Sequence, residues 1–434
     1  MSTVIICGAG VDKSDGINMP LGVELVPHIR DFLKTDDGQA IDKALRDVLP
    51  NLRFSYDKFV KSAVDKLSNE FRSQVTVIVE RINIQIEKDD TNEQDRRMGK
   101  LIVALLTKIQ RLQDDVRLDE KTAELITEVF QGDVSIEDEN IIDLPKLSFT
   151  DVFNTVMRRI FERSLDEPHH PILQHVRGNL MDFEKLLMDN FIGFYTESES
   201  QMKNYMYLSW TLWAYLKYRE SKVNGGADKI PFYGAVPADW RMITLNYTAF
   251  ARKRTATEPA LYFHGDLSSF VRMRDRQQMS IDGYGNLNML GFIKDIIGAN
   301  TSFDKGKRAT CVVPSIIPPL KMKPVLSNAF IETWFRCKEA ISEARRIVIV
   351  GYSFNYADEH FNDLIRCHKN KPIVVVDPYA EAVRENLMNI FSHRPDDYVC
   401  SKVQGKDCFA KDDLRIIKAK AAELDWAQFD DIRA

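Results

Sequence analysis

The sequence lacks several features that would argue against an ordinary soluble enzyme. Its six cysteines include no CxxC pair, so neither a disulfide framework nor a four-cysteine zinc site is indicated. Basic residues are not in excess, since the formal net charge is -5, and composition therefore leaves no footprint of nucleic-acid binding. No apolar run approaches the roughly 20 residues of a membrane-spanning helix. We see no secretory leader and expect a cytoplasmic protein with reduced thiols.

What is present is the pattern of an α/β protein. The chain has 434 residues, of which 44% are apolar, enough for a proper core. Five short, branched, mostly apolar runs predict strands buried on both faces: residues 3–7, 242–246, 260–264, 346–350 and 372–376. Helical patterns precede the last two runs, and another follows Pro378. This alternation predicts a Rossmann-like, doubly wound parallel sheet.

The strand pattern disappears between about residues 40 and 230, where the sequence is rich in charge and helically periodic. We therefore expect one discontinuous domain, residues 1–40 and 232–434, with an all-helical insertion at 41–231 that serves as an oligomer or partner contact. Within the insertion, Tyr207, Trp210, Trp213 and Tyr218 lie near helical spacing. They form either a helix face in the core or a stacking and contact surface, and the core is the commoner outcome.

The first strand runs directly into Gly8-Ala9-Gly10. Glycines at such a turn allow backbone N–H groups to approach a pyrophosphate, but they also suit a tight corner between a strand and a helix. The usual dinucleotide fingerprint requires a third glycine, and Lys13 occupies that position. The turn alone therefore leaves both interpretations open and is not that of an ordinary dehydrogenase.

Polar residues also stand at the ends of the later strands. Asn246 and His264 are the last residues of two of the predicted strands, at the edge where a doubly wound sheet binds its ligands. An amide there can orient a water molecule or a ribose hydroxyl, and an imidazole can exchange a proton with it. A histidine with only a structural role in the turn is the alternative. Gly351-Tyr352-Ser353 and Asp377 end two further strands, and Asp358 is placed to cap the following helix.

Taken in order, the motifs GAG, LNYT, FHGDL, VGYSF and VVVDP resemble those of the sirtuin family. They are most similar to the sirtuin-like NAD-consuming domains of bacterial anti-phage systems, over about residues 1–40 and 232–410. The resemblance implies NAD+ as the substrate, and Asn246 and His264 as the catalytic residues. It also implies a binding set for the dinucleotide: Gly8, Ala9, Gly10, Asn18, Pro20, Thr248, Gly351, Tyr352, Ser353 and Asp377.

Two departures from the family pattern bear on the reaction. Thr248 stands where sirtuins carry the acid that helps to hold the nicotinamide carboxamide. The CxxC pairs that bind structural zinc in deacetylating sirtuins are absent, so we expect no zinc. The loss of that module favours hydrolysis of NAD+ to nicotinamide and ADP-ribose. An NAD-dependent deacylase or ADP-ribosyltransferase and a non-catalytic NAD or ADP-ribose sensor are the alternatives.

An enzyme that destroys NAD+ must be kept silent in its host. The resemblance implies an effector that depletes NAD+ during abortive infection, controlled through assembly. We expect a homo-oligomer and, as a partner, a HerA-family hexameric ATPase. Neither a membrane nor direct nucleic-acid binding is expected.

Overall fold

The computed structural model describes the chain apart from residues 1–2, 15, 57–71, 90, 112–119, 131–148, 168–169, 181–182, 197, 224–230, 255, 281–287, 304–308, 318–324, 356–357 and 432–434. The chain forms two compact units. Unit 1 comprises Met1–Leu25, Asp31–Leu52 and Leu187–Ala434, and unit 2 comprises Val26–Arg30 and Arg53–Leu186. Unit 1 thus includes residues 41–52 and 187–231 of the stretch assigned to the helical insertion. The division of the chain at residues 40 and 231 stays a prediction.

An eight-stranded sheet forms the centre of unit 1, in the order β3-β2-β1-β7-β8-β11-β10-β9. The strands from β3 to β11 in this order are parallel, and β10 and β9 are antiparallel. Their bounds are β1 Thr3–Cys7, β2 Arg241–Thr244, β3 Leu261–Tyr262, β7 Arg346–Val350, β8 Ile373–Asp377, β9 Val399–Val403, β10 Lys406–Lys411 and β11 Leu414–Lys418. Each of the five predicted runs overlaps one of these strands, which confirms the α/β, Rossmann-like fold class.

Strand β1 lies at the centre and pairs with β2 on one side and β7 on the other. All five of its residues are buried, as expected for a Val- and Ile-rich strand covered on both faces. Cys7 is in register with both Thr244 and Val350, so the residues that follow β1, β2 and β7 emerge at one edge. The strand order reverses at β1, and ligands of open α/β sheets bind at such a switch point.

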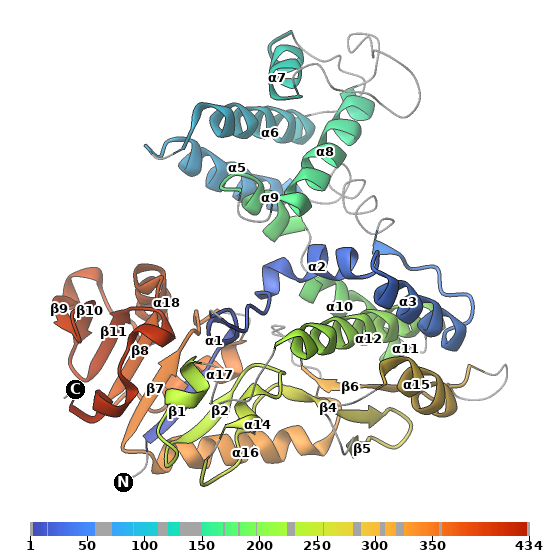
Figure 1. Cartoon of the computed structure of the whole chain (residues 1–434). Helices are drawn as coiled ribbons and strands as arrows, with labels where there is room; N and C mark the ends of the chain where they lie inside the picture. Colours follow the sequence, from blue (N-terminus) through green and yellow to red (C-terminus); the bar gives the residue numbers. More distant parts are fainter. Residues whose placement is uncertain are drawn as a thin grey trace. The chain divides into compact units, whose positions relative to one another are not determined.

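Helices cover this sheet (Figure 1). The longer ones are α16 Asn328–Glu343, which packs on β3, α17 Glu359–Arg366, and α18 Ala380–Phe391, which packs on β8 and β11. Ile341, Phe361 and Leu387 from these helices join the buried cluster beneath the central strands. Three short helices are α1 Ala9–Asp12, α13 Pro231–Ala235 and α14 Phe250–Lys253. Asp358 is the N-cap residue of α17, as predicted, although its side chain makes no capping hydrogen bond.

A second, antiparallel sheet in unit 1 was not predicted. Its order is β5-β4-β6, with bounds β4 Gly265–Arg272, β5 Gln277–Ser280 and β6 Val312–Ile316. Helix α12 (Glu199–Lys222) packs against β4 and β6. Its Trp210 and Trp213 are fully buried, and their Nε1 atoms donate to the carbonyls of Val312 (2.9 Å) and Leu267 (2.8 Å). Tyr207 is buried as well, whereas Tyr218 is half-buried, so three of the four predicted aromatic residues of this helix belong to the core.

The secondary-structure elements that the structure describes in unit 2 are all helices. Helices α5 Arg72–Ile86, α6 Glu93–Arg111, α7 Glu120–Phe130, α8 Phe149–Asp166 and α9 Leu173–Leu180 lie within it. Helix α6 packs against α5, α7 and α8, and its Leu101, Ile102 and Leu105 are fully buried. Apolar residues at this spacing form one stripe of a helix and account for the packing.

The remaining helices are α2 Leu25–Phe32, α3 Asp36–Val48, α10 Phe183–Phe191, α11 Gly193–Thr196 and α15 Met289–Phe292. Short 3-10 segments lie at Gly22–Glu24, Gly298–Asn300, Pro395–Asp397, Ala421–Glu423 and Trp426–Asp431, and a π-helical turn at Ile293–Ile297. None of the helices that the structure describes is long and apolar enough to cross a bilayer.

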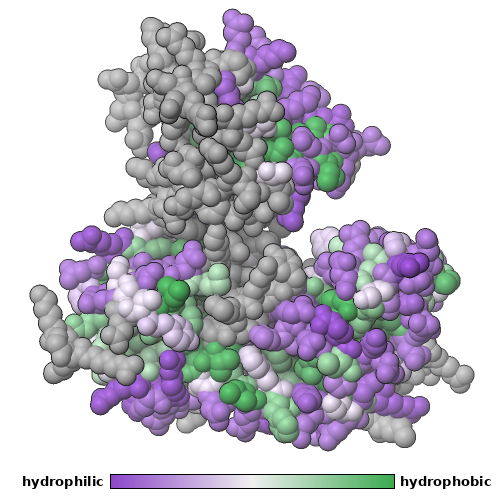
Figure 2. Space-filling view, turned by 180° about the vertical axis from the view of Figure 1, so that it is seen from behind, coloured by the Kyte–Doolittle hydropathy of each residue, from purple (hydrophilic) through white to green (hydrophobic). Residues whose placement is uncertain are grey.

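On the face drawn in Figure 2, hydrophilic residues predominate among the coloured atoms and hydrophobic ones gather in small groups.

Candidate active site

The glycine turn after β1 is packed directly against the end of β7. The amide of Gly8 donates to the carbonyl of Val350 (2.9 Å), and the amide of Gly10 donates to that of Gly351 (2.8 Å). A Cβ atom on Gly8 would lie 2.4 Å from the Gly351 oxygen, and one on Gly10 would lie 2.8 Å from the Gly351 Cα. The glycines at these positions are therefore required for close approach of two backbone segments.

This packing bears on the two interpretations of the turn. Because the Gly8 and Gly10 amides already have partners in the protein, a phosphate that takes hydrogen bonds from them must displace those partners. Ala9, between them, is exposed. The close packing against β7 is thus enough to explain why glycines occupy positions 8 and 10. Contacts of Gly8, Ala9 and Gly10 with a phosphate stay a prediction.

Asn246 lies two residues after the end of β2, beside this turn. Its Nδ2 donates to the carbonyl of Gly8 (3.0 Å), and its backbone amide donates to Oγ1 of Thr244 (3.0 Å). Asn246 is 8% exposed, so its side-chain amide is a buried, hydrogen-bonded group at the edge of the sheet rather than a surface group.

Asp12, on α1, is a carboxylate that the sequence reasoning did not single out. It is 3% exposed, and it accepts hydrogen bonds from the hydroxyls of Tyr233 (2.7 Å) and Thr248. Burial raises its pKa from 3.8 to about 6, against the lowering effect of the hydrogen bonds from Thr248, Tyr233 and Asn246, while Glu220 raises it further. Thr248, in the turn after β2, is thus bonded to an acid supplied by another element.

The raised pKa of Asp12 predicts a pH-dependent stability. Between about pH 4 and pH 6 the folded chain holds a proton that the unfolded chain has released, so the free energy of unfolding falls as the pH rises through this window. The difference between the two pKa values corresponds to about 3 kcal/mol. Relative to wild type, Asp12→Asn should therefore gain about this much stability between pH 4 and pH 7, measured by urea denaturation. A stability difference that is the same at both pH values would contradict the assignment.

His264 follows β3 and is 2% exposed. Its Nδ1 lies 3.3 Å from the carbonyl oxygen of Leu245, which can only accept, so Nδ1 carries the proton. Its Nε2 lies 3.3 Å from Oδ1 of Asp358, close enough for an ion pair, but makes no hydrogen bond to any residue that the structure describes. Nε2 is therefore the nitrogen that can take up or release a proton.

The loop of Gly16–Pro20 is anchored to the same region. The amide of Met19 donates to the carbonyl of Asp12 (2.7 Å), and the carbonyl of Asn18 accepts from Arg219 (2.7 Å). The Asn18 side chain is exposed and Pro20 is half-buried. Lys13, at the position of the missing third glycine, forms an ion pair with buried Glu24 (2.8 Å). Lys13 thus ties the turn to the 3-10 segment Gly22–Glu24.

The predicted residues at the ends of β7 and β8 differ in their burial and in their hydrogen-bond partners. Gly351 adopts a φ of +62°, and its amide donates to the carbonyl of Val376 (3.0 Å). The Tyr352 side chain is buried and donates to Oδ1 of Asn362 on α17 (2.8 Å), whereas Ser353 is exposed. Asp377 accepts from the amide of Tyr379 (2.8 Å), and burial raises its pKa.

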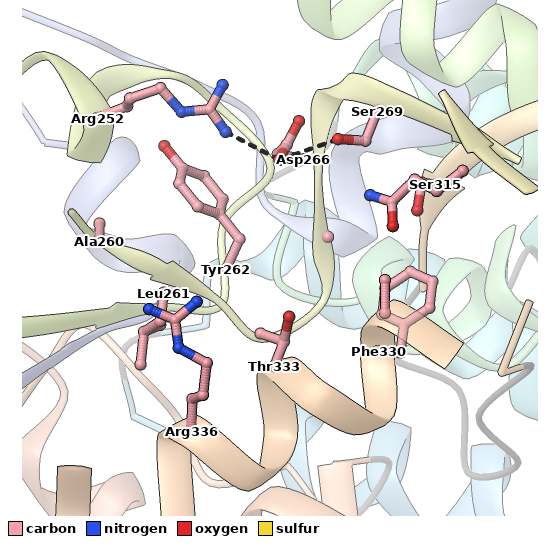
Figure 3. Close-up of a pocket in the computed structure, with 13 residues that line it drawn as sticks. Arg252, Ala260, Leu261, Tyr262, Asp266, Ser269, Ser315, Phe330, Thr333 and Arg336 are labelled. Atoms are coloured by element: carbon pink, nitrogen blue, oxygen red, sulfur yellow. Dashed lines mark hydrogen bonds and ion pairs between the residues drawn. The ribbon is translucent and has the colours of Figure 1, made fainter. Parts of the chain in front are cut away.

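A polar cavity of about 180 Å³ lies where residues of β3, β4 and α16 come together (Figure 3). Arg252, Tyr262, Asp266, Ser315 and Arg336 contribute to its lining, and Arg252 is paired with Asp266 (2.9 Å). Ligand sites usually enclose roughly 300–1,000 Å³, so this cavity is too small for a dinucleotide. Tyr262 links the cavity to the strand ends, since its hydroxyl donates to the Thr248 carbonyl (2.9 Å).

No group of three or more His, Cys, Asp or Glu side chains among the described residues is arranged to hold a metal ion. No known family profile matches the chain, and no curated protein matches it. Solved structures do match. One is a mutant Sir2 homologue bound to ADP-ribose (13% identity, TM-score 0.26), of which the match covers 62%, and 39% of this chain. Another is a Sir2 homologue in complex with NAD, at 13% identity and a TM-score of 0.29. The match covers 78% of that homologue and 48% of this chain.

A third similar structure, at 13% identity and a TM-score of 0.27, concerns the mechanism and regulation of Sir2 enzymes. The chain spans less than two thirds of the first of these neighbours. TM-scores below 0.5 do not establish a common fold over the whole length. The fold class and the site of this protein therefore rest on its own strand order and side-chain geometry.

Proposed function

We propose that this protein is an NAD+ glycohydrolase, which cleaves the bond between nicotinamide and ribose. One observation carries the proposal. Two groups occur at the ends of neighbouring parallel strands beside the turn of Gly8: the amide of Asn246, which donates to the Gly8 carbonyl, and Nε2 of His264, which makes no hydrogen bond to any described residue. This pair supplies what the reaction requires, namely a polar group to orient a hydroxyl or a water molecule and a base to accept its proton.

The chemistry needs little else from the protein. The bond between the anomeric carbon and the pyridinium nitrogen breaks, and its electron pair leaves with neutral nicotinamide through an oxocarbenium-like transition state. The oxygen of water then bonds to the anomeric carbon, and one proton is released, so the products are nicotinamide, ADP-ribose and a proton. Asn246 orients the water or the ribose hydroxyls, and Nε2 of His264 takes the proton. Positioning and charge stabilisation account for the remaining rate enhancement.

Uncontrolled cleavage of NAD+ would harm the host, so the activity must be switched. We extend the proposal to an effector that depletes NAD+ in anti-phage defence, acts as a homo-oligomer in the cytoplasm, and is controlled by a HerA-family hexameric ATPase. The basis for this extension is the resemblance of the sequence motifs. Co-purification with such an ATPase tests it, and a monomer whose activity the ATPase leaves unchanged would contradict it.

The direct test follows the products. Full-length protein is incubated with NAD+, alone and with the ATPase partner and phage-derived nucleic acid, and nicotinamide and ADP-ribose are quantified by chromatography. We expect both products in equal amounts without any peptide acceptor. Release of nicotinamide only with an acyl-lysine peptide would indicate a deacylase, and labelling of protein would indicate a transferase. Tight binding of NAD+ without turnover in every condition would indicate a sensor.

A further inference from the structure

The cavity beside β3 has no part in the proposed reaction. It encloses about 180 Å³, and its walls come from β3, β4, β5, β6, α14 and α16, all of unit 1. A space of this size has room for about six water molecules, at roughly 30 Å³ each. It therefore suits a small molecule rather than a nucleotide.

The carboxylate that lines this cavity, Asp266, already has partners in the protein. It accepts hydrogen bonds from the amide and the hydroxyl of Ser268 and from the guanidinium of Arg252 (2.9 Å). Arg252 also donates to Oγ of Ser268 (2.7 Å), and its Cζ lies 5.0 Å from the centre of the Tyr262 ring. The charges of Arg252 and Asp266 thus compensate each other, and no cationic ligand is needed to neutralise the carboxylate.

The second arginine of the lining has no such partner. Arg336 of α16 forms no hydrogen bond or ion pair with any residue that the structure describes. The two arginines outnumber the one carboxylate, so the lining carries an excess positive charge. Figure 3 shows Arg336 extending from α16 toward β3. Because a guanidinium can bind a carboxylate through two parallel hydrogen bonds, an anionic group is favoured at this end of the cavity.

The other end of the cavity combines a hydroxyl with an aromatic ring. Ser315 of β6 lines the cavity, is 2% exposed, and makes no side-chain hydrogen bond to any described residue. A buried hydroxyl without a partner costs free energy, which a ligand that bonds to it recovers. Phe330 lies nearby, since a Cβ atom on Gly265 would be 3.1 Å from its ring and in contact with the Ser315 carbonyl. In Figure 3, Ser315 and Phe330 lie on the side away from Arg336.

We propose that this cavity binds a short organic acid with an apolar body and a second polar group. The carboxylate pairs with Arg336, the body packs on Phe330, and Ser315 donates to the second polar group. Inorganic phosphate carries the charge but has no apolar part to contact Phe330. His264 does not line the cavity, although the neighbouring Gly265 does, so the site is separate from that of NAD+ cleavage. The inference is therefore independent of the proposed function.

The test is calorimetric titration of full-length wild type and the variants Arg336→Gln, Ser315→Ala and Lys338→Gln. The probes are 4-hydroxybenzoate, benzoate, the neutral 4-hydroxybenzamide and inorganic phosphate. We expect wild type to bind 4-hydroxybenzoate at least about tenfold more tightly than the amide or phosphate. Arg336→Gln should weaken this binding about tenfold, because a charge-assisted hydrogen bond is lost. Ser315→Ala should weaken 4-hydroxybenzoate about threefold and leave benzoate unchanged, because only the former has a group for the hydroxyl to bond.

Lys338 is the matched control, since it is exposed on α16 outside the lining, and Lys338→Gln should bind every probe as wild type does. The inference is wrong if neither acid binds wild type, if Arg336→Gln binds them unchanged, or if phosphate binds as tightly as they do. Displacement of the acid by excess ADP-ribose would assign the cavity to the dinucleotide site instead. Nicotinamide release is measured separately, so the failure of either proposal leaves the other standing.

Discussion

Replacing His264 by alanine is expected to slow nicotinamide release by about 10²–10⁴-fold, the usual contribution of a general acid–base group. The expectation follows from the state of the imidazole. Nδ1 faces the Leu245 carbonyl and so holds the proton. Nε2 is buried, makes no hydrogen bond within the part of the chain that the structure describes, and lies 3.3 Å from the Asp358 carboxylate. A neighbouring carboxylate stabilises the imidazolium that forms when Nε2 accepts a proton. Alanine removes that acceptor while leaving the binding groups on the other strands.

His368→Ala is a matched control, because His368 is half-buried on the C-terminal side of α17, where its Nε2 pairs with Oγ of Ser342 (2.9 Å). This variant should retain wild-type activity. Asn246→Ala should lose activity as His264→Ala does. The melting temperatures of all variants are compared, because removing a buried imidazole also leaves a cavity that can lower stability. A folded His264→Ala protein that consumes NAD+ at the wild-type rate would remove His264 from the mechanism.

The parallel sheet could be predicted from the sequence because its strands are buried on both faces. Such strands are continuous apolar runs, and residues 3–7 and 346–350 match β1 and β7 residue for residue. Strands with mixed composition carried no such signal. β9, with four of its five residues exposed, and β5, with three of four exposed, depend on pairing with their neighbours and were missed.

Asn246 and His264 were identifiable as candidates from the sequence, because an amide and an imidazole at strand ends indicate a chemistry, and their catalytic roles stay predictions. Asp12 was not, because a carboxylate in the first turn of a helix is ordinarily solvated and stabilises the helix dipole. Only the folded chain shows that this one is enclosed by Tyr233, more than 200 residues away. Tyr352 illustrates the converse, since its place in the VGYSF motif does not reveal that its side chain points to Asn362.

The glycine at the end of β7 carries the second large prediction. Gly351→Ala is expected to destabilise the fold by about 3–5 kcal/mol, which combines a left-handed backbone with overpacking. Gly351 has a φ of +62°, and a Cβ atom there would lie 2.6 Å from the Val11 nitrogen and 2.7 Å from the Gly10 carbonyl carbon. Both contacts are with backbone atoms, which cannot rotate away as a side chain would. All five tryptophans lie in unit 1, so urea denaturation followed by tryptophan fluorescence reports on the affected unit.

Two further glycines separate the contributions. Gly405 has a φ of +76°, and no atom of the described residues lies within 4 Å of its added Cβ, so Gly405→Ala should lose only the conformational part, about 1–2 kcal/mol. Gly8 has a φ of -93°, which any residue adopts, so Gly8→Ala isolates the clash with the Gly351 carbonyl. If Gly351→Ala is no less stable than Gly405→Ala, the turn is not closely packed against β7. The glycines of the turn would then serve to bind a phosphate and not to allow close packing. In that case added NAD+ or ADP-ribose should stabilise wild type, but not Gly8→Ala, against unfolding.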